Sequence, residues 1–176
     1  MNRSKHSDDL WLVIFKKNNN LFTKILDHIF RVSRLLALKL ISLVLINRHF
    51  IALITTIDYV SVGKLRTDGY IKALKINNLN IKDDLILKIE DIDNFESKID
   101  SLIKNNDIDA IFAVNELFAV TAIKIANKHG KKVPEDISVI GFTDGIISKY
   151  SSPSISTVGQ NGIKMGEKAA KMLIER

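Results

Sequence analysis

The sequence predicts an α/β fold, a doubly wound parallel sheet with helices on both faces. Two observations support this class. From Phe50 onward, short apolar segments rich in β-branched residues alternate with longer amphipathic segments, and this alternation is typical of parallel strands joined by right-handed helical crossovers. Glycine and proline, which mark turns and helix ends, first occur at Gly63 and Pro134. We therefore expect the regular domain to begin near residue 50.

The expected strands are short apolar runs, as is usual for strands buried on both faces of a parallel sheet. They number about four or five, which is an ordinary sheet size. These runs are Phe50–Thr56, Leu85–Ile89, Ala110–Val114, Ile137–Phe142 and the brief Ser156–Val158.

The expected helices carry apolar side chains on one face. They cover Ser61–Asn77, Asn94–Asn105, Glu116–His129 and Gly162–Glu175. Gly130 follows the third helix, where a residue in the left-handed conformation ends many helices. In the last helix we expect one stripe to face inward, made of Ile163, Gly166, Ala169, Ala170, Leu173 and Ile174. Leu35–Ile46 could supply one more helix before the first strand.

The first 49 residues form an atypical basic leader. Residues 1–50 hold nine Lys or Arg and three Asp or Glu, whereas the remainder holds seventeen of each, so the net charge of +6 belongs to the leader. Its basic residues are scattered, and they lack the spacing of a DNA-reading helix. We expect residues 1–34 to be poorly packed or irregularly helical. The apolar run Leu35–Ile46 is too short to span a membrane and too far from Met1 for a secretory signal, so we expect a cytoplasmic protein.

Polar residues follow each expected strand, and in open parallel sheets ligands bind beyond these carboxyl ends. The segments are Ile57–Tyr59, Glu90–Asp93, Asn115–Glu116, Thr143–Asp144 and Gln160–Asn161. Their side chains suit a ligand rich in hydroxyl or amide groups. At any single position a helix cap or turn role is the better explanation, but five such segments together favour a polar cleft. Arg66, early in its helix, could clamp hydroxyls or a carboxylate, although a lone Arg on a helix is more often solvated.

The sequence does not match the common enzyme motifs. No G-x-G-x-x-G follows a strand and no G-x-S-x-G occurs, and the segment Asp58–Leu65 lacks the first Gly and the final Ser or Thr of a phosphate loop. The four histidines are isolated and cysteine is absent, so we predict no metal, no cofactor and no catalytic residues. The acidic loop Glu90–Asp93 could bind a hard cation but more simply is a loop at a strand end.

One stretch resembles the effector domain of LacI-type (lactose-repressor) regulators. It is DAIFAVNELFAVTAIKIANKHGKKVPEDISVIGFTD, from Asp109 to Asp144, with IALITT and KLRTDGY before it and PSISTVGQN and MGEKAA after it. The resemblance runs from about Phe50 to Arg176. It implies a lobe of periplasmic-binding-protein type I, a non-enzymatic chain, and a sugar or similar small effector held in a cleft between two lobes.

The resemblance also implies ligand contacts, carried over by position. Arg66 matches the clamping Arg of R-x-x-G-Y, and Asn115 matches the Asn after the third strand. Many members have a ligand-binding Asp where this chain has Thr143, and Asp144 could substitute for it. Gln160 matches a cleft or hinge position. Asp91 lies in the segment where another contact is expected, with a less certain alignment.

We expect residues 50–176 to form mainly the second lobe, with the helix 162–175 crossing toward the first lobe. The resemblance implies operator DNA as a partner only through the family's N-terminal domain, and a homodimer in the complete family. Residues 1–49 contain no recognisable DNA-binding domain, so the chain resembles a regulator fragment truncated at both ends. The alternatives are a non-functional remnant, a solute-binding protein of the same fold and, less favoured, a small α/β enzyme.

Overall fold

The computed structural model describes residues 48–56, 61–142, 145–159 and 162–175, without the side chains of residues 61 and 62. The chain divides into two units, which we describe separately. One unit, within residues 33–160, contains the sheet, and the other contains helix α7 (Gly162–Ile174). The expectations for residues 1–34 and for the run Leu35–Ile46 fall outside the described residues.

The sheet has five strands in the order β2-β1-β3-β4-β5, and every pair of neighbours is parallel. This confirms the predicted class. The strands are β1 (Ile51–Thr56), β2 (Ile86–Ile89), β3 (Ala110–Ala113), β4 (Ser138–Phe142) and β5 (Ser156–Val158). Each lies within, or differs by at most one residue from, the apolar run that predicts it.

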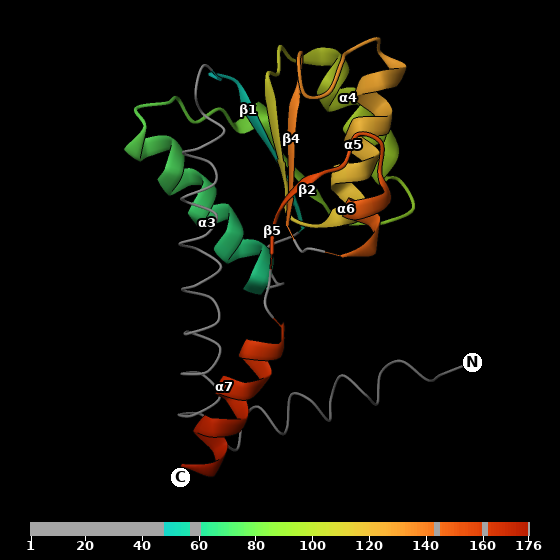
Figure 1. Cartoon of the computed structure of the whole chain (residues 1–176). Coiled ribbons are helices and arrows are strands. Elements are labelled where there is room, and N and C mark those ends of the chain that lie inside the picture. Colours follow the sequence, from blue (N-terminus) through green and yellow to red (C-terminus); the bar gives the residue numbers. More distant parts are fainter. Residues whose placement is uncertain (1–47, 57–60, 143–144, 160–161, 176) are drawn as a thin grey trace, which may run out of the picture. The chain divides into compact units, whose positions relative to one another are not determined.

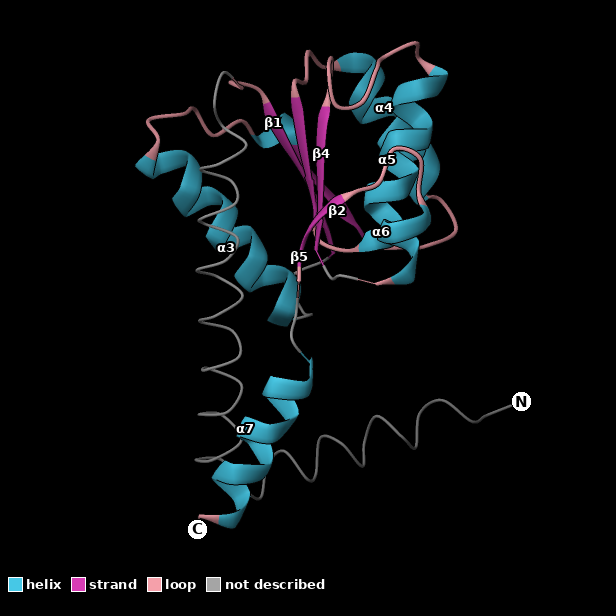
Figure 2. Ribbon diagram, in the orientation of Figure 1, coloured by secondary structure: helices cyan, strands magenta, loops and turns pink. Residues whose placement is uncertain are grey.

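Helices cover both faces of the sheet, as predicted (Figure 1). On one face lies α3 (Ser61–Ile76), and on the other lie α4 (Phe95–Asn105), α5 (Glu116–Lys128) and α6 (Ile146–Tyr150). Figure 2 shows the resulting three layers, with the strands between the helices. Two short elements were not predicted, namely α6 and the 3₁₀ helix η1 (Asp83–Leu85).

The core forms where the helices meet the sheet. The first five residues of β1, which lies beside the central strand β3, are buried, and Phe142 at the end of β4 is fully buried. From α4, the apolar residues Phe95, Ile99, Leu102 and Ile103 are all buried. From α3, Tyr70 is fully buried and its hydroxyl donates a 2.7 Å hydrogen bond to the carbonyl of Ile51, which fixes the helix to β1. Gly130 has φ +72°, as its predicted role at the end of α5 requires.

The amino edge of the sheet is closed by a clamp that we call the amino-edge clamp, made of Arg48 and Asp109. The Arg48 guanidinium donates to the carbonyls of Pro134, Glu135 and Asp136 at 3.0–3.3 Å. The Asp109 carboxylate accepts hydrogen bonds from the two backbone amides that precede β1, at 2.6 and 3.0 Å. The chain is therefore fastened where it enters the sheet.

Helix α7 has no buried residue. Ile163, Leu173 and Ile174, which the sequence predicts to face inward, are 78%, 61% and 83% exposed. The prediction of an inward stripe is therefore wrong for these side chains. Amphipathic spacing identifies which side chains share a face, but it does not supply a surface to cover them.

Candidate functional site

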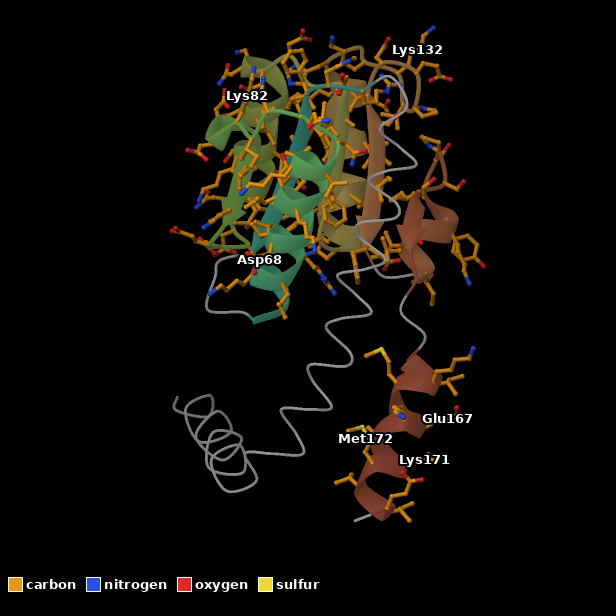
Figure 3. All side chains as sticks on the ribbon, turned by 90° about the vertical axis from the view of Figure 1, so that its left-hand side faces the viewer. Asp68, Lys82, Lys132, Glu167, Lys171 and Met172 are labelled. Atoms are coloured by element: carbon orange, nitrogen blue, oxygen red, sulfur yellow. The ribbon has the colours of Figure 1, made fainter. Side chains whose placement is uncertain are left out.

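The strand order identifies one place on the sheet as the candidate ligand site. After β1 the chain crosses over to β2 on one side, whereas β3, β4 and β5 follow on the other side. The carboxyl ends of β1 and β3 therefore flank a topological switch point, which is where open α/β sheets form ligand crevices. Helix α3 starts at this edge. Figure 3 shows Asp68 of α3 toward the opposite end of the sheet domain from Lys82 and Lys132, which precede β2 and β4.

Arg66 extends from the first turns of α3 across this edge. Its Nη1 donates a 2.5 Å hydrogen bond to the carbonyl of Val114, the residue that follows β3. Its guanidinium carbon lies 3.8 Å from the centre of the Phe142 ring, at the end of β4. The structure therefore places Arg66 at the carboxyl ends of two neighbouring strands. The residues that it contacts, Val114 and Phe142, directly precede Asn115 and Thr143 in the sequence.

The guanidinium of Arg66 is partly buried. Burial lowers the pKa of Arg66 to about 10, so the group keeps its positive charge at neutral pH. Its Nε is buried and has no hydrogen-bond partner within the described part of the chain. A buried donor without an acceptor costs free energy, so Arg66 is suited to an additional acceptor at this edge.

Asn115 lies beside Arg66 and begins α5. Its Oδ1 accepts a 2.8 Å hydrogen bond from the amide of Phe118, which makes Asn115 the N-cap of the helix. This confirms the helix-cap role that the sequence favours at a single position such as Asn115. The cap bond uses only the side-chain oxygen, and the Nδ2 donors make no hydrogen bond to other described residues, so a ligand role stays a prediction.

Glu116, the next residue, holds α6 in place through one carboxylate oxygen. Its Oε1 accepts hydrogen bonds from the Ser148 hydroxyl at 2.6 Å, the Gly145 amide at 2.5 Å and the Ser148 amide at 3.3 Å. The hydrogen bond from the Ser148 hydroxyl is the main cause that lowers the pKa of Glu116, and the two amides lower it further. The carboxylate is therefore stabilised in its charged form.

The other four predicted contacts stay predictions. Thr143, Asp144 and Gln160 lie outside the described residues. Asp91 is exposed, and its carboxylate accepts a 3.1 Å hydrogen bond from the amide of Asp93, within the same loop. A separate hollow between β2 and α4 contains none of the predicted residues; its lining includes Asp84, Ser97, Lys98, Ser101 and Asn106. Among the described residues there is no cluster of three or more metal-binding side chains.

The sequence gives no sign of two contributors, Phe142 and Ser148. Phe142 ends an apolar strand and is typical of a core residue, so its contact with Arg66 is invisible before folding. Glu116 follows an N-cap residue, and an acidic residue there is common because it interacts favourably with the helix dipole. The relevant signal is the polar pair Asn115–Glu116 at a strand end, which the sequence does show.

Comparison with known proteins identifies the family. A family model described as the periplasmic binding protein-like domain matches residues 47–176, most of the chain. The chain belongs to this family, as a LacI-type effector-binding domain. It is 42% identical over 119 residues to the transcriptional regulator MalR of Clostridium butyricum. The matched segment covers 66% of this chain and 36% of the relative. It is 32% identical over 118 residues to the repressor PurR of Pasteurella multocida, over 66% of this chain and 35% of that relative.

Solved structures of LacI-type regulators share the fold. A complex of the regulator CelR with cellobiose superposes with a TM-score of 0.72 at 25% identity, over 84% of this chain and 45% of that one. A sugar-binding LacI-family regulator from Escherichia coli, complexed with phosphate, gives a TM-score of 0.73 at 25% identity, over 80% of this chain and 52% of the other. This chain therefore spans about a third of the curated relatives and about half of these solved chains.

The family membership confirms the prediction that this LacI-type domain is not an enzyme, because its relatives are transcriptional regulators. In the part of the chain that the structure describes, no helix has both the length and the apolar character needed to cross a membrane.

Proposed function

We propose that this chain is the ligand-sensing part of a cytoplasmic LacI-type transcriptional regulator, and that it binds a small, hydroxyl-rich effector at the carboxyl edge of its sheet. The observation that carries the proposal is the position of Arg66, whose guanidinium lies on Phe142 and Val114 beside the switch point. A fixed, charged and partly desolvated guanidinium is a strong donor for hydroxyl or carboxylate oxygens.

The remaining contacts of this proposed site come from neighbouring strand ends. Asn115 supplies an amide that offers donors, and Thr143, Asp144 and Gln160 follow β4 and β5 in the sequence. Asp91, in the loop after β2, is a more peripheral candidate. A site of mixed donors and acceptors at a sheet edge suits a sugar-like ligand. The solved complex of the related regulator CelR contains cellobiose, which makes this disaccharide a reasonable first probe.

In this proposal residues 50–176 form mainly the second of two lobes, with α7 directed to a first lobe, and the effector lies between the lobes. In a complete, homodimeric regulator the effector would favour one of two lobe arrangements, and these arrangements would differ in affinity for operator DNA. DNA contact would come from an N-terminal domain of the family type.

The experiment is a binding screen followed by one substitution. The purified chain is titrated by calorimetry with cellobiose and a panel of other mono- and disaccharides, and the tightest ligand is carried forward. Arg66→Ala should weaken its binding by roughly 1.5–3 kcal/mol, the scale of a hydrogen bond to a charged group. Lys72→Ala is the matched control, because Lys72 is an exposed cation later in the same helix. Equal affinity of Arg66→Ala and the native chain would remove Arg66 from the site, and failure of every sugar to bind would contradict the proposed function.

A further inference from the structure

We propose that Glu116 is a positioning residue for the ligand site: its carboxylate fixes Gly145 and the start of α6 on the N-terminal end of α5. Glu116 thereby holds the start of α6 on the helix that Asn115 caps. The relevance of this position to a ligand rests on the function proposed above, but the positioning itself can be tested without one.

Three hydrogen bonds converge on one carboxylate oxygen of Glu116. The Ser148 hydroxyl and the amides of Gly145 and Ser148 all donate to Glu116 Oε1, at 2.5–3.3 Å. Ser148 is buried, with an exposed fraction of 2%. These donors belong to the start of a helix of only five residues, which is too short to be stable by its own backbone hydrogen bonds. A partner outside the helix is therefore needed to hold it, and Glu116 is that partner.

Gly145 has no side chain at the point where the Glu116 carboxylate lies. Its backbone angles, φ −100° and ψ −173°, are accessible to any residue, so conformational freedom does not explain the glycine. Space does explain it. A Cβ atom at this position would lie 2.6 Å from Glu116 Oε1 and would also overlap Oε2. Gly145 and the Glu116 carboxylate therefore fit together as a pair, and neither can be enlarged without displacing the other.

Both members of this pair are next to predicted ligand contacts in the sequence. On the β4 side, Phe142 is fully buried and its ring is covered by Arg66. On the α6 side, Gly145 is bonded to Glu116. Thr143 and Asp144 are the two residues between these anchored positions in the sequence. Glu116 therefore fixes the residue that directly follows two predicted contacts in the sequence, and it also directly follows Asn115.

The test measures amide hydrogen exchange by NMR on the full chain. Glu116→Ala should speed exchange of the Gly145 and Ser148 amides at least tenfold, since they lose their acceptor, and should leave amides in β1 and β3 unchanged. Glu116→Gln should restore most of the protection, because the Gln oxygen can still accept these bonds. Glu96→Ala is the matched control, because Glu96 is also a bonded carboxylate but lies on the exposed surface of α4, where it pairs with Lys124.

A double-mutant cycle adds a test of the paired fit. Gly145→Ala alone should displace the carboxylate and speed exchange at Ser148. In the double variant Glu116→Ala and Gly145→Ala the overlap is gone, so exchange should be no faster than in Glu116→Ala alone. Additive effects, or unchanged exchange in Glu116→Ala, would overturn the positioning role.

A binding measurement then connects the position to the site. With cellobiose, or the tightest sugar of the panel, Glu116→Ala should weaken binding about tenfold and Glu116→Gln only about twofold. Equal affinities for Glu116→Ala and the native chain would overturn the link to the ligand. Failure of the native chain to bind any sugar would overturn the proposed function and leave the exchange result to decide the positioning role.

Discussion

The guanidinium carbon of Arg66 lies over the ring of Phe142, 3.8 Å from the ring centre. This contact joins the first turns of α3 to the end of β4, and the bond from Arg66 to the Val114 carbonyl adds the end of β3. A long, flexible side chain is thereby held in one orientation before any ligand arrives. Such preorganisation reduces the entropy that binding would otherwise cost.

The Arg66–Phe142 contact should be measurable as a coupling energy. Arg66→Met and Phe142→Leu keep apolar bulk but remove the cation and the ring, respectively. In a double-mutant cycle of urea unfolding, the two changes should deviate from additivity by about 0.5–2 kcal/mol, the usual range for a cation–π pair. Deviation below about 0.3 kcal/mol would show that the contact contributes nothing beyond packing.

Tyr70 should make the protein lose stability at alkaline pH, and Tyr70→Phe should lack this contribution. Burial raises the pKa of Tyr70 well above its ordinary value of about 10. The native state therefore keeps a proton that the unfolded state releases, so stability is lost as the pH rises beyond about 10. At neutral pH the variant should be less stable by about 0.5–1.5 kcal/mol, because the hydrogen bond to Ile51 is missing.

Urea unfolding between pH 7 and pH 11 tests this expectation. The difference between the native chain and Tyr70→Phe should narrow above pH 10. Tyr150→Phe is the control, because Tyr150 is 84% exposed and its hydroxyl makes no hydrogen bond to other described residues. A constant difference across the whole range would contradict the buried position of the Tyr70 hydroxyl.

Protonation of Glu116 should lower the stability of the native state at acid pH. The Ser148 hydroxyl, followed by the amides of Gly145 and Ser148, lowers the pKa of Glu116 below its ordinary value of about 4.3. A depressed pKa means that the native state releases its proton before the unfolded state does, so the stabilisation is complete above about pH 5 and disappears as the pH falls through the native pKa. Glu116→Gln should therefore flatten part of the acid limb of the stability curve.

Thermal unfolding between pH 3 and pH 7 measures that limb. Glu96→Gln is the matched control on the exposed surface of α4, and an exposed ion pair contributes little. Identical acid limbs for the native chain and Glu116→Gln would show that the bonds on Oε1 do not depend on the charge.

The amino-edge clamp should contribute to stability through Asp109. Asp109→Ala removes the acceptor of the His49 and Phe50 amides, and hydrogen bonds to charged groups contribute about 1.5–3 kcal/mol. Asp107→Ala, at an exposed position in the same loop, should change the free energy of unfolding by less than about 0.5 kcal/mol. Equal unfolding midpoints of the two variants in urea would contradict the clamp.

Most of the sheet domain could be predicted from the sequence because its signals are local. Each strand is a continuous apolar run, and α4 shows its buried face through the spacing of Phe95, Ile99 and Leu102. Helix α6 could not be predicted in the same way. It is one short turn beyond a strand, and what holds it is a carboxylate on α5, which is distant in the sequence. A helix that depends on a non-local partner leaves no periodic pattern.

The candidate site was predictable in place but not in detail. Parallel topology puts strand ends at one edge, so Arg66 and Asn115 could be assigned to that edge before the structure was known. The sequence could not reveal that Arg66 already has two partners, or that Asn115 uses its oxygen to cap α5. Such contacts depend on side-chain direction and on which strand lies next to which, and both arise only when the sheet is assembled.

The amino-edge clamp has an evolutionary consequence. Among the described residues, Arg48 donates to backbone carbonyls of the turn 134–136, so these hydrogen bonds do not themselves require particular side chains there. Substitution of Glu135 is therefore expected to be nearly neutral as long as the turn keeps its shape. Substitution of Arg48 removes its three hydrogen bonds to the turn at once. Within this contact, selection should therefore be stronger on Arg48 than on Glu135, and a survey of substitutions should find more variation at Glu135.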